Sequence, residues 1–172
     1  VPLIKERLRL KGNNDVNLMT GEHKGKGWAV RQGMLKARGL YRFMCDADLA
    51  MPIEGLQLFL KEISLGQDIV IGSRQISGAR RLDEPKSRHI LGRLFNFVVK
   101  LLAVGHFQDT QCGFKCFRGE LVNDLFGRQK TVGFGFDVEI LYLAVKRGLK
   151  VKEIPIDWYF QTDSKVRPVR DA

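Results

Sequence analysis

Short apolar segments with strand character alternate with amphipathic segments of helical period along most of this chain, and this alternation restricts the fold more than any other feature. It favours an α/β layered fold, in which a mostly parallel sheet is flanked by helices. The predicted strands are 16–19, 41–45, 68–72 and 151–158, with 109–117 irregular or strand, and the predicted helices are 1–10, 29–38, 52–63, 89–104, 118–126 and 136–147. Ligands of such sheets bind beyond the carboxyl ends of the strands.

Three local features give further structural expectations. Small residues recur at every fourth position of one predicted helix, so this stripe is expected to lie close against the sheet: Ala29, Gly33 and Ala37. Pro155 has no N–H to donate, which places the predicted strand 151–158 at an edge or a bend. Segment 73–88 is rich in arginine and has little apolar periodicity, so we expect a loop there, and long loops commonly carry function.

The net charge limits the kinds of partner. The chain has 172 residues, with 29 Lys and Arg against 19 Asp and Glu, which gives a formal charge of +10 at pH 7. Its 44% hydrophobic and 28% charged residues are typical of a globular domain rather than of a disordered basic tail. The excess positive charge indicates a polyanionic partner, which is a nucleic acid, a nucleotide diphosphate or an anionic membrane surface.

Cysteine content and apolar run length argue against two other classes. Three cysteines, an odd number, are not typical of a secreted disulfide framework, so a reducing compartment is expected. Cys112 and Cys116 have no second Cys or His pair at zinc-site spacing. The longest apolar segment, 94–107, would reach about 21 Å as a helix, short of the roughly 30 Å hydrocarbon core. It is expected either to pack in the core or to rest on a membrane surface.

Two carboxylates follow the predicted strand 41–45 directly. Asp46 and Asp48 are two residues apart, so in an extended segment they project to the same side, about 6.6 Å apart at the backbone. Carboxylate oxygens suit Mg²⁺ or Mn²⁺, which commonly bind through one or two acids plus substrate phosphates. The alternative is a polar turn before Pro52. Because the two aspartates directly follow a predicted buried strand, the metal site is favoured over the turn.

Six segments in fixed order make the pattern far more specific than any one of them. They are GKGWAVRQGM at 25–34, DAD at 46–48, IGSR at 71–74, DTQCGFK at 109–115, FDVE at 136–139 and SKV at 164–166. Together they resemble family 2 glycosyltransferases of the polyprenyl-phosphate sugar synthase type, and within that type the glucosyl branch. The resemblance extends from about residue 17 to the last residue. It implies a GT-A-type, Rossmann-like fold.

The resemblance also implies roles for individual residues. Asp46 and Asp48 would hold Mg²⁺ or Mn²⁺ against the nucleotide diphosphate of the donor. Asp109 and Glu139 are the candidate catalytic acids, and either could instead be a structural partner of a neighbouring arginine. Arg74, Arg88 and Lys165 are implied to contact the donor diphosphate or the acceptor phosphate, and for each of these three a solvated surface charge is the alternative. Lys26 and Gln111 are also implied to bind substrate.

The implied reaction is inverting transfer of a hexose from a nucleotide sugar to dolichyl or polyprenyl phosphate. Glucose from UDP-glucose is favoured, and mannose from GDP-mannose is the alternative. The partners are then the nucleotide-sugar donor, the lipid phosphate and the cytoplasmic face of a membrane, where a peripheral location is expected. A phosphate monoester has a second pKa of about 6, so it is largely dianionic at neutral pH and can attack the sugar without a strong general base.

The amino-terminal part departs from the pattern of the resembling family. Members begin with a V-P-x-Y-N-E strand and a second strand ending in D-D-G-S, and neither motif is found here. We therefore expect residues 1–172 to form a single GT-A domain that lacks its N-terminal strands, and an inactive truncated relative is an alternative. Two other classes fit less well. An aspartyl phosphotransferase would have Thr or Val where Ala50 stands, and a nucleic-acid binder would show a recognition motif.

Overall fold

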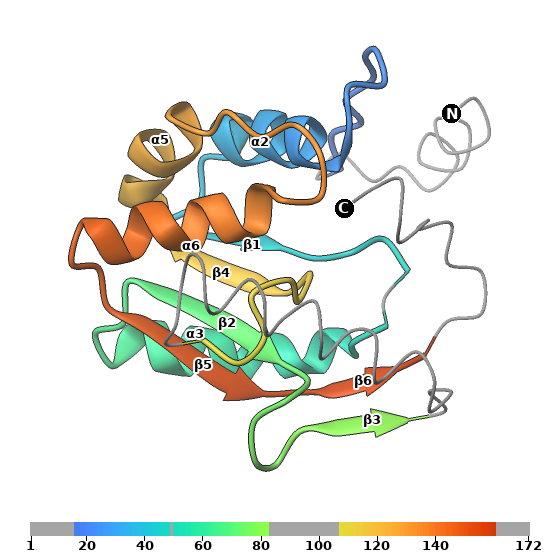
Figure 1. The fold of residues 1–172 in the computed structure, drawn as a ribbon, viewed down its shortest axis with the longest axis vertical. Helices are drawn as coiled ribbons and strands as arrows, with labels where there is room; N and C mark the ends of the chain where they lie inside the picture. The colour runs from blue at the N-terminus through green and yellow to red at the C-terminus, as the bar shows by residue number, and fades with distance from the viewer. Residues whose placement is uncertain (1–15, 49, 83–106, 161–172) are drawn as a thin grey trace.

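The computed structural model describes residues 16–48, 50–82 and 107–160, and they form a sheet with helices on both faces (Figure 1). The helices are α2 (Lys26–Lys36), the short 3-10 helix η1 (Ile53–Gly55), α3 (Leu56–Ser64), α5 (Gly119–Gly127) and α6 (Phe136–Lys146). The strands are β1 (Tyr41–Met44), β2 (Ile69–Ser73), β3 (Arg80–Leu82), β4 (Lys115–Arg118), β5 (Val151–Pro155) and β6 (Asp157–Tyr159).

The main sheet has the strand order β1-β4-β2-β5. β4 is antiparallel to both β1 and β2, whereas β2 and β5 are parallel. β1, β2 and β5 therefore point in one direction and β4 alone is reversed, so the expected mostly parallel α/β sheet is confirmed with one inverted strand. The inversion places the start of β4 beside the ends of β1 and β2.

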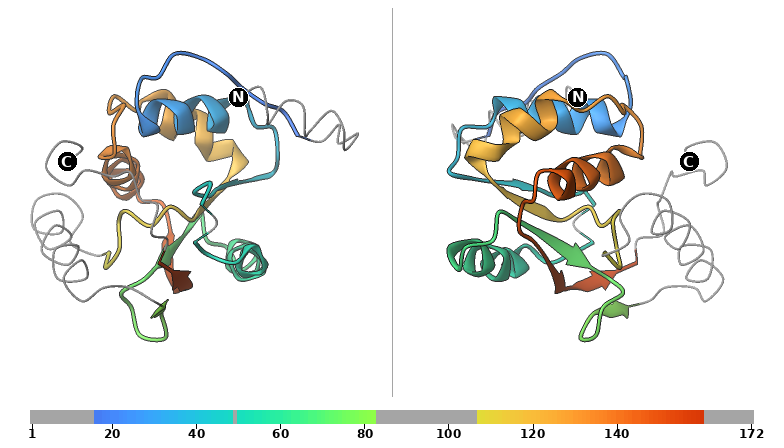
Figure 2. Two further views of the ribbon diagram at one scale, coloured as in Figure 1. Left: turned by 90° about the vertical axis from the view of Figure 1, so that its right-hand side faces the viewer. Right: turned by 60° about the vertical axis from the view of Figure 1, so that its left-hand side comes forward.

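Alternating side chains of the strands build one core on each face of the sheet. Ile69 and Ile71 of β2 and Phe117 of β4 belong to the core that α2, α5 and α6 cover, whereas Val70 and Cys116 belong to the core that α3 covers. Two views of the molecule show this three-layer arrangement (Figure 2). Because both faces are covered, the strand interiors can be uniformly apolar, as the sequence pattern indicated.

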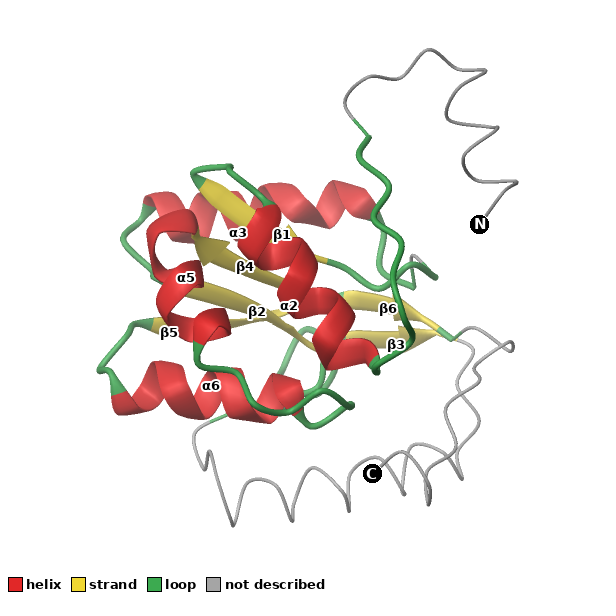
Figure 3. Cartoon of the chain, turned by 90° about the horizontal axis from the view of Figure 1, so that it is seen from above, coloured by secondary structure: helices red, strands yellow, loops and turns green. Residues whose placement is uncertain are grey.

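A second, two-stranded parallel sheet joins β3 to β6 beyond the carboxyl ends of β2 and β5 (Figure 3). The predicted strand 151–158 is divided here: β5 ends at Pro155 on the edge of the main sheet, and β6 begins at Asp157. Both expectations for Pro155, an edge and a bend, are confirmed. The chain thus leaves the main sheet and pairs again a few residues later.

Several sequence expectations need correction or lie outside the described residues. The predicted strand 16–19 is wrong, because residues 16–20 have no regular structure and most of their apolar side chains are exposed; β propensity takes effect only where a strand can pair and pack. Segment 73–88 contains β3, which the sequence missed since its Arg-Arg-Leu has no apolar alternation. The predicted helices 1–10 and 89–104 lie outside the described residues. No described helix is long and apolar enough to cross a membrane.

Truncating a core aromatic at the centre of the sheet tests this packing. Phe117 is fully buried and meets the ring of Phe126 edge-on at 5.3 Å between centroids. We expect Phe117→Ala to lower the free energy of unfolding by about 3–5 kcal/mol, because it removes buried area and leaves a cavity. Urea denaturation measures the change. Leu58→Ala, at a side chain 55% exposed, should change it by less than about 0.5 kcal/mol; similar losses for both variants would contradict this core.

Candidate active site at the carboxyl edge of the sheet

The reversed strand β4 brings three segments that carry candidate site residues to one edge of the sheet. Lys115, the first residue of β4, lies opposite both Met44 at the end of β1 and Ile71 in β2. Asp46 follows β1, Arg74 follows β2, and the turn 109–114 leads into β4. The backbone therefore places these candidate residues at the carboxyl ends of β1 and β2, where ligands of such sheets are expected to bind.

Asp46 is paired with Lys26, the first residue of α2. The Lys26 Nζ lies 2.6 Å from the Asp46 Oδ1, and both side chains are partly exposed, at 28% and 33%. Asp48 lies on the surface, and its Oδ1 accepts a hydrogen bond from the Ala50 N–H at 3.1 Å. Partial burial together with the charges of Asp46 and Asp48 raises the pKa of the Cys45 thiol, so both carboxylates contribute negative potential at the end of β1.

Gly113 makes room for the Asp46 carboxylate. A Cβ atom at Gly113 would lie 2.0 Å from the Asp46 Oδ2 and 2.2 Å from its Cγ, a separation that no side chain can occupy. The glycine of the DTQCGFK segment is therefore required by the first aspartate of the DAD segment. Two motifs that are far apart in the sequence form one surface, on which the carboxylate lies directly against backbone.

Arg74 and Asp109 form a buried bidentate pair. The Arg74 Nε donates to the Asp109 Oδ2 at 2.6 Å and the Nη2 to Oδ1 at 2.8 Å, while the backbone N–H of Arg74 adds a bond to Oδ2 at 3.0 Å. Burial of the fully enclosed carboxylate opposes ionisation, but Arg74 outweighs it and holds the pKa of Asp109 below its usual range. These contacts favour the structural role of Asp109 that the sequence left open; its catalytic role stays a prediction.

The Arg74–Asp109 pair is itself held from two sides. The Arg74 guanidinium lies 5.6 Å from the centre of the Trp158 ring in β6, and the Arg81 Nε donates to the Arg74 carbonyl at 3.2 Å. The Glu153 carboxylate accepts the Asp109 N–H at 2.8 Å. Both ends of the pair are therefore fixed before any substrate binds.

Lys115 and Asp137 form a second buried ion pair, which the sequence analysis did not identify. The Lys115 Nζ donates to the Asp137 Oδ1 and to the Cys112 carbonyl, each at 2.5 Å, and both side chains are at most 4% exposed. Burial raises the pKa of Asp137, although the positive charges of Lys115 and Lys26 oppose the increase. The negative charge of Asp46 adds to it, so Asp137 lies within electrostatic range of the DAD segment. The sequence feature that could have indicated this pair is a lysine inside the apolar run GFKCF, where the alternation of side chains along a strand directs it into the core.

The remaining predicted site residues are placed as follows. Glu139 is engaged by the backbone, since its two oxygens accept the N–H groups of Lys130 and Thr131 at 2.8 and 2.7 Å. It is partly exposed; burial opposes its ionisation, but the bonds from Thr131 and Lys130 outweigh it and lower the pKa of Glu139. It orders the loop before α6. Gln111 is partly exposed in the turn 109–114. Arg88 and Lys165 lie outside the described residues.

Two cavities adjoin the edge. The larger, of about 830 Å³, is lined by the loop before α2 and by residues 131–135, and we call it the Lys26 pocket. Trp28 and Phe134 line it, with Lys24 5.8 Å from the Trp28 ring centre and Lys26 5.8 Å from that of Phe134. It therefore offers ring faces and ammonium groups beside Asp46.

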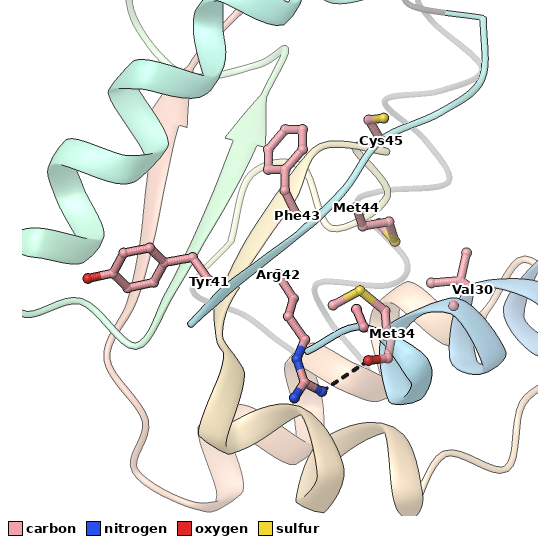
Figure 4. Close-up of a pocket in the computed structure, with 9 residues that line it drawn as sticks. Val30, Met34, Tyr41, Arg42, Phe43, Met44 and Cys45 are labelled. Atoms are coloured by element: carbon pink, nitrogen blue, oxygen red, sulfur yellow. Dashed lines mark hydrogen bonds between the residues drawn. The ribbon is translucent and has the colours of Figure 1, made fainter. Parts of the chain in front are cut away.

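The smaller cavity, of about 440 Å³, is a cleft between α2 and β1 that ends at Cys45 (Figure 4). Gly33 and Ala37 line it, and a Cβ atom at Gly33 would meet nothing within 4 Å. The expectation that the small-residue stripe lies close against the sheet is thus wrong. The buried Met34 makes that contact instead, because its longer side chain reaches the core beside Met44.

Comparisons with known proteins agree with this geometry. The profile of Glycosyl transferase family 2 matches residues 4–126. A dolichyl-phosphate beta-glucosyltransferase of Drosophila melanogaster is 38% identical over 154 residues, which cover 86% of this chain and 47% of that protein. One from Trichomonas vaginalis is 36% identical over 149 residues, covering 83% of this chain and 44% of its own length.

The fold has solved counterparts as well. The crystal structure of glucosyl-3-phosphoglycerate synthase from Mycobacterium tuberculosis, in complex with Mn²⁺, UDP and glucosyl-3-phosphoglycerate, superposes with a TM-score of 0.59 at 15% identity, covering 96% of this chain and 57% of that one. The chain belongs to glycosyl transferase family 2 and has its GT-A-type fold. It spans about half the length of the curated relatives that it matches.

Removing Arg74 tests the buried pair at this edge. We expect Arg74→Met to cost about 3–5 kcal/mol of unfolding free energy at neutral pH, because Asp109 is left buried and unpaired. The wild-type Asp109 has a lowered pKa, so its contribution is lost as pH falls through that pKa. In the variant, the guanidinium no longer opposes burial, so the pKa of Asp109 rises and protonation relieves the cost. The difference in unfolding free energy between the wild type and Arg74→Met should therefore shrink toward about pH 4.

Urea denaturation at the two pH values measures this difference. Adding Asp109→Asn to Arg74→Met should recover part of the loss at neutral pH, since the uncompensated charge is gone. A loss that is the same at both pH values and is not reduced by Asp109→Asn would contradict the pairing.

Proposed function

We propose that this chain carries the catalytic edge of an inverting glycosyltransferase that moves a hexose from a nucleotide diphosphate sugar to a polyprenyl or dolichyl phosphate. The observation that carries the proposal is the convergence of Asp46 and Asp48 with Lys26 and Arg74 at the carboxyl edge of the sheet. Carboxylates beside cations are what a metal-bound diphosphate requires. The names of the relatives support the sugar and the lipid acceptor.

Asp46 and Asp48 fit a divalent cation. Their oxygens are the ligands that Mg²⁺ and Mn²⁺ prefer, and the missing side chain at Gly113 keeps the Asp46 carboxylate accessible beside backbone. Within residues 16–48, 50–82 and 107–160, no group of three or more His, Cys, Asp or Glu could hold a metal ion. Two acids with substrate phosphates completing the shell is the usual arrangement for Mg²⁺. When bound, the ion would offset charge on the leaving nucleotide.

The residues of the chain then act mainly by binding and orientation. Lys26 borders both Asp46 and the Lys26 pocket, and we assign this pocket to the donor. Arg74 presents its charge at a fixed place because Asp109 and Trp158 hold its guanidinium. Cations fixed before binding stabilise developing negative charge without reorganisation.

The acceptor supplies its own nucleophile. The carboxylates of Asp109 and Glu139 are both occupied by hydrogen bonds, so neither is presented as a free base. A phosphate dianion attacks C1 of the sugar as the bond from C1 to the nucleotide diphosphate breaks, and the configuration inverts in this single displacement. Orientation and charge stabilisation would then supply most of the rate.

The finer substrate assignments belong to this proposal. Glucose is favoured over mannose because the relatives are named as glucosyltransferases, and UDP is the nucleotide in the complex of the mycobacterial synthase. A peripheral location at the cytoplasmic face of a membrane is part of the proposal; a lipid acceptor and the net charge of +10, which is attracted to anionic headgroups, support it.

A donor panel tests the proposal. We expect manganese-dependent transfer of labelled sugar from UDP-glucose to polyprenyl phosphate, with GDP-mannose as the competing donor, measured by extraction of the labelled lipid. Asp46→Asn and Asp48→Asn should each lower the rate by more than about 100-fold, since even residues behind metal ligands commonly cost 10–100-fold. Glu120→Gln, an exposed acid on α5, should have no effect. Absence of transfer from both donors would contradict the proposal, and preference for GDP-mannose would correct the sugar.

The pH dependence identifies the base. If the acceptor dianion is the nucleophile, kcat/KM should fall about tenfold per unit below about pH 6, where the phosphate gains its second proton. The pKa values of Asp109 and Glu139 are lowered. If either carboxylate were the base, kcat/KM would therefore fall only below about pH 4, the usual pKa of a carboxyl group. A rate that holds down to about pH 4 would contradict the self-activated acceptor.

A further inference from the structure

Lys115 and Asp137 are unusual because a charged pair lies inside an apolar core. The side chains are 1% and 4% exposed, and Lys115 projects from β4 toward the core formed with α5 and α6. Taking two charges out of water costs about as much as their attraction returns, and apolar side chains of similar volume are commonly as stable. Stability therefore does not explain the pair.

The second contact of Lys115 points to a different role. Its Nζ donates to the Cys112 carbonyl at 2.5 Å, so the ammonium joins the first turn of α6 to the turn 109–114. That turn carries Asp109 at its start and Gly113 near its end. Fixing one carbonyl between them restricts both.

Residues near both ends of this turn contact residues of the proposed site. Gly113 lies so close to Asp46 that an added Cβ would be 2.0 Å from the carboxylate, and Asp109 holds the Arg74 guanidinium. A small shift of the turn would therefore move Asp46 or release Arg74. Lys115 thus connects the start of β4 to the turn and to α6 through charged hydrogen bonds.

We propose that Lys115 and Asp137 are positioning residues that hold the turn 109–114 against Asp46 and Arg74, and so set the geometry of the metal and diphosphate site. The inference rests on the proposed function. It adds a residue pair that touches neither metal nor substrate and acts through the Cys112 carbonyl.

Replacing the whole pair by apolar residues separates positioning from stability. We expect Lys115→Met/Asp137→Leu to remain folded, by circular dichroism and thermal unfolding, because no charge is left unpaired. Its Mn²⁺ dissociation constant, measured by electron paramagnetic resonance of free Mn²⁺, should rise about 10–100-fold, and kcat should fall more than KM rises. Hydrogen–deuterium exchange of the peptide 107–118 should increase.

A second variant and a control complete the test. Lys115→Gln/Asp137→Asn keeps a donor for the Cys112 carbonyl and should retain Mn²⁺ affinity closer to that of the wild type. If the apolar variant does not fold, Lys115→Met/Asp137→Asn, which removes the donor without leaving a buried charge, should show the raised Mn²⁺ dissociation constant instead. Asp124→Leu/Arg128→Met removes a more exposed pair at the end of α5, in which Asp124 also binds Arg147. Helix α5 follows β4 and so begins at the opposite edge of the sheet, and this variant should leave Mn²⁺ affinity unchanged.

The outcomes separate the inference from the proposed function. Wild-type affinity and unchanged exchange in a folded variant that lacks the donor to the Cys112 carbonyl would overturn the positioning role while leaving the function in place. Absence of Mn²⁺ binding by the wild-type chain would instead contradict the proposed metal site, and with it the role assigned to the pair.

Discussion

The reversal of one strand is the constraint on which the site depends. In a fully parallel sheet, the segment before β4 would lie at the amino edge, far from the ends of β1 and β2. Because β4 runs antiparallel between them, the turn 109–114 enters at the carboxyl edge, where Lys115 lies opposite Met44 and Ile71. The contacts between Asp109 and Arg74 and between Gly113 and Asp46 are available only in this arrangement.

The three ion pairs at this edge differ in burial, and the difference separates their roles. The pair between Lys26 and Asp46 is partly exposed on both sides, Arg74 with Asp109 is exposed only at the arginine, and Lys115 with Asp137 is enclosed. An exposed pair can exchange partners at little cost, whereas a buried charge that loses its partner is strongly destabilising. The outermost pair is thus the one able to open for a ligand, while the inner two hold its surroundings.

The sequence predicted the layers and the edge at which the site lies, because apolar periodicity and strand ends are local properties. Six of the described elements lie within a few residues of their predicted places, for example α6 at Phe136–Lys146. The inverted direction of β4 could not be predicted, since strand direction depends on pairing between segments remote in sequence, which a local pattern does not contain. The strand β3 was missed because it is stabilised by pairing with β6 and by Arg80 with Asp157, both remote in sequence.

Predictions for single site residues were limited by a different cause. Asp109 and Arg74 were predicted from the sequence as separate site residues, and only the fold shows that they bind each other. The fold also shows that the backbone of the loop before α6 donates hydrogen bonds to Glu139. The burial of Lys115 could not be predicted from its place in an apolar run alone, because a lysine is rarely buried. Pairing between charges that are remote in sequence is the information that a linear pattern lacks.

The charge balance at the edge bears on the proposed metal. The chain as a whole is strongly basic, with a net charge of +10. At the edge, however, Lys26, Arg74 and Lys115 are matched by Asp46, Asp109 and Asp137, and Asp48 adds one further negative charge. Arg81 and Glu153 contact these residues and carry opposite charges, so including them leaves the excess of one negative charge unchanged. Counted over the described residues, this edge is therefore slightly negative, and a divalent cation held by Asp46 and Asp48 would reverse its sign for the proposed diphosphate.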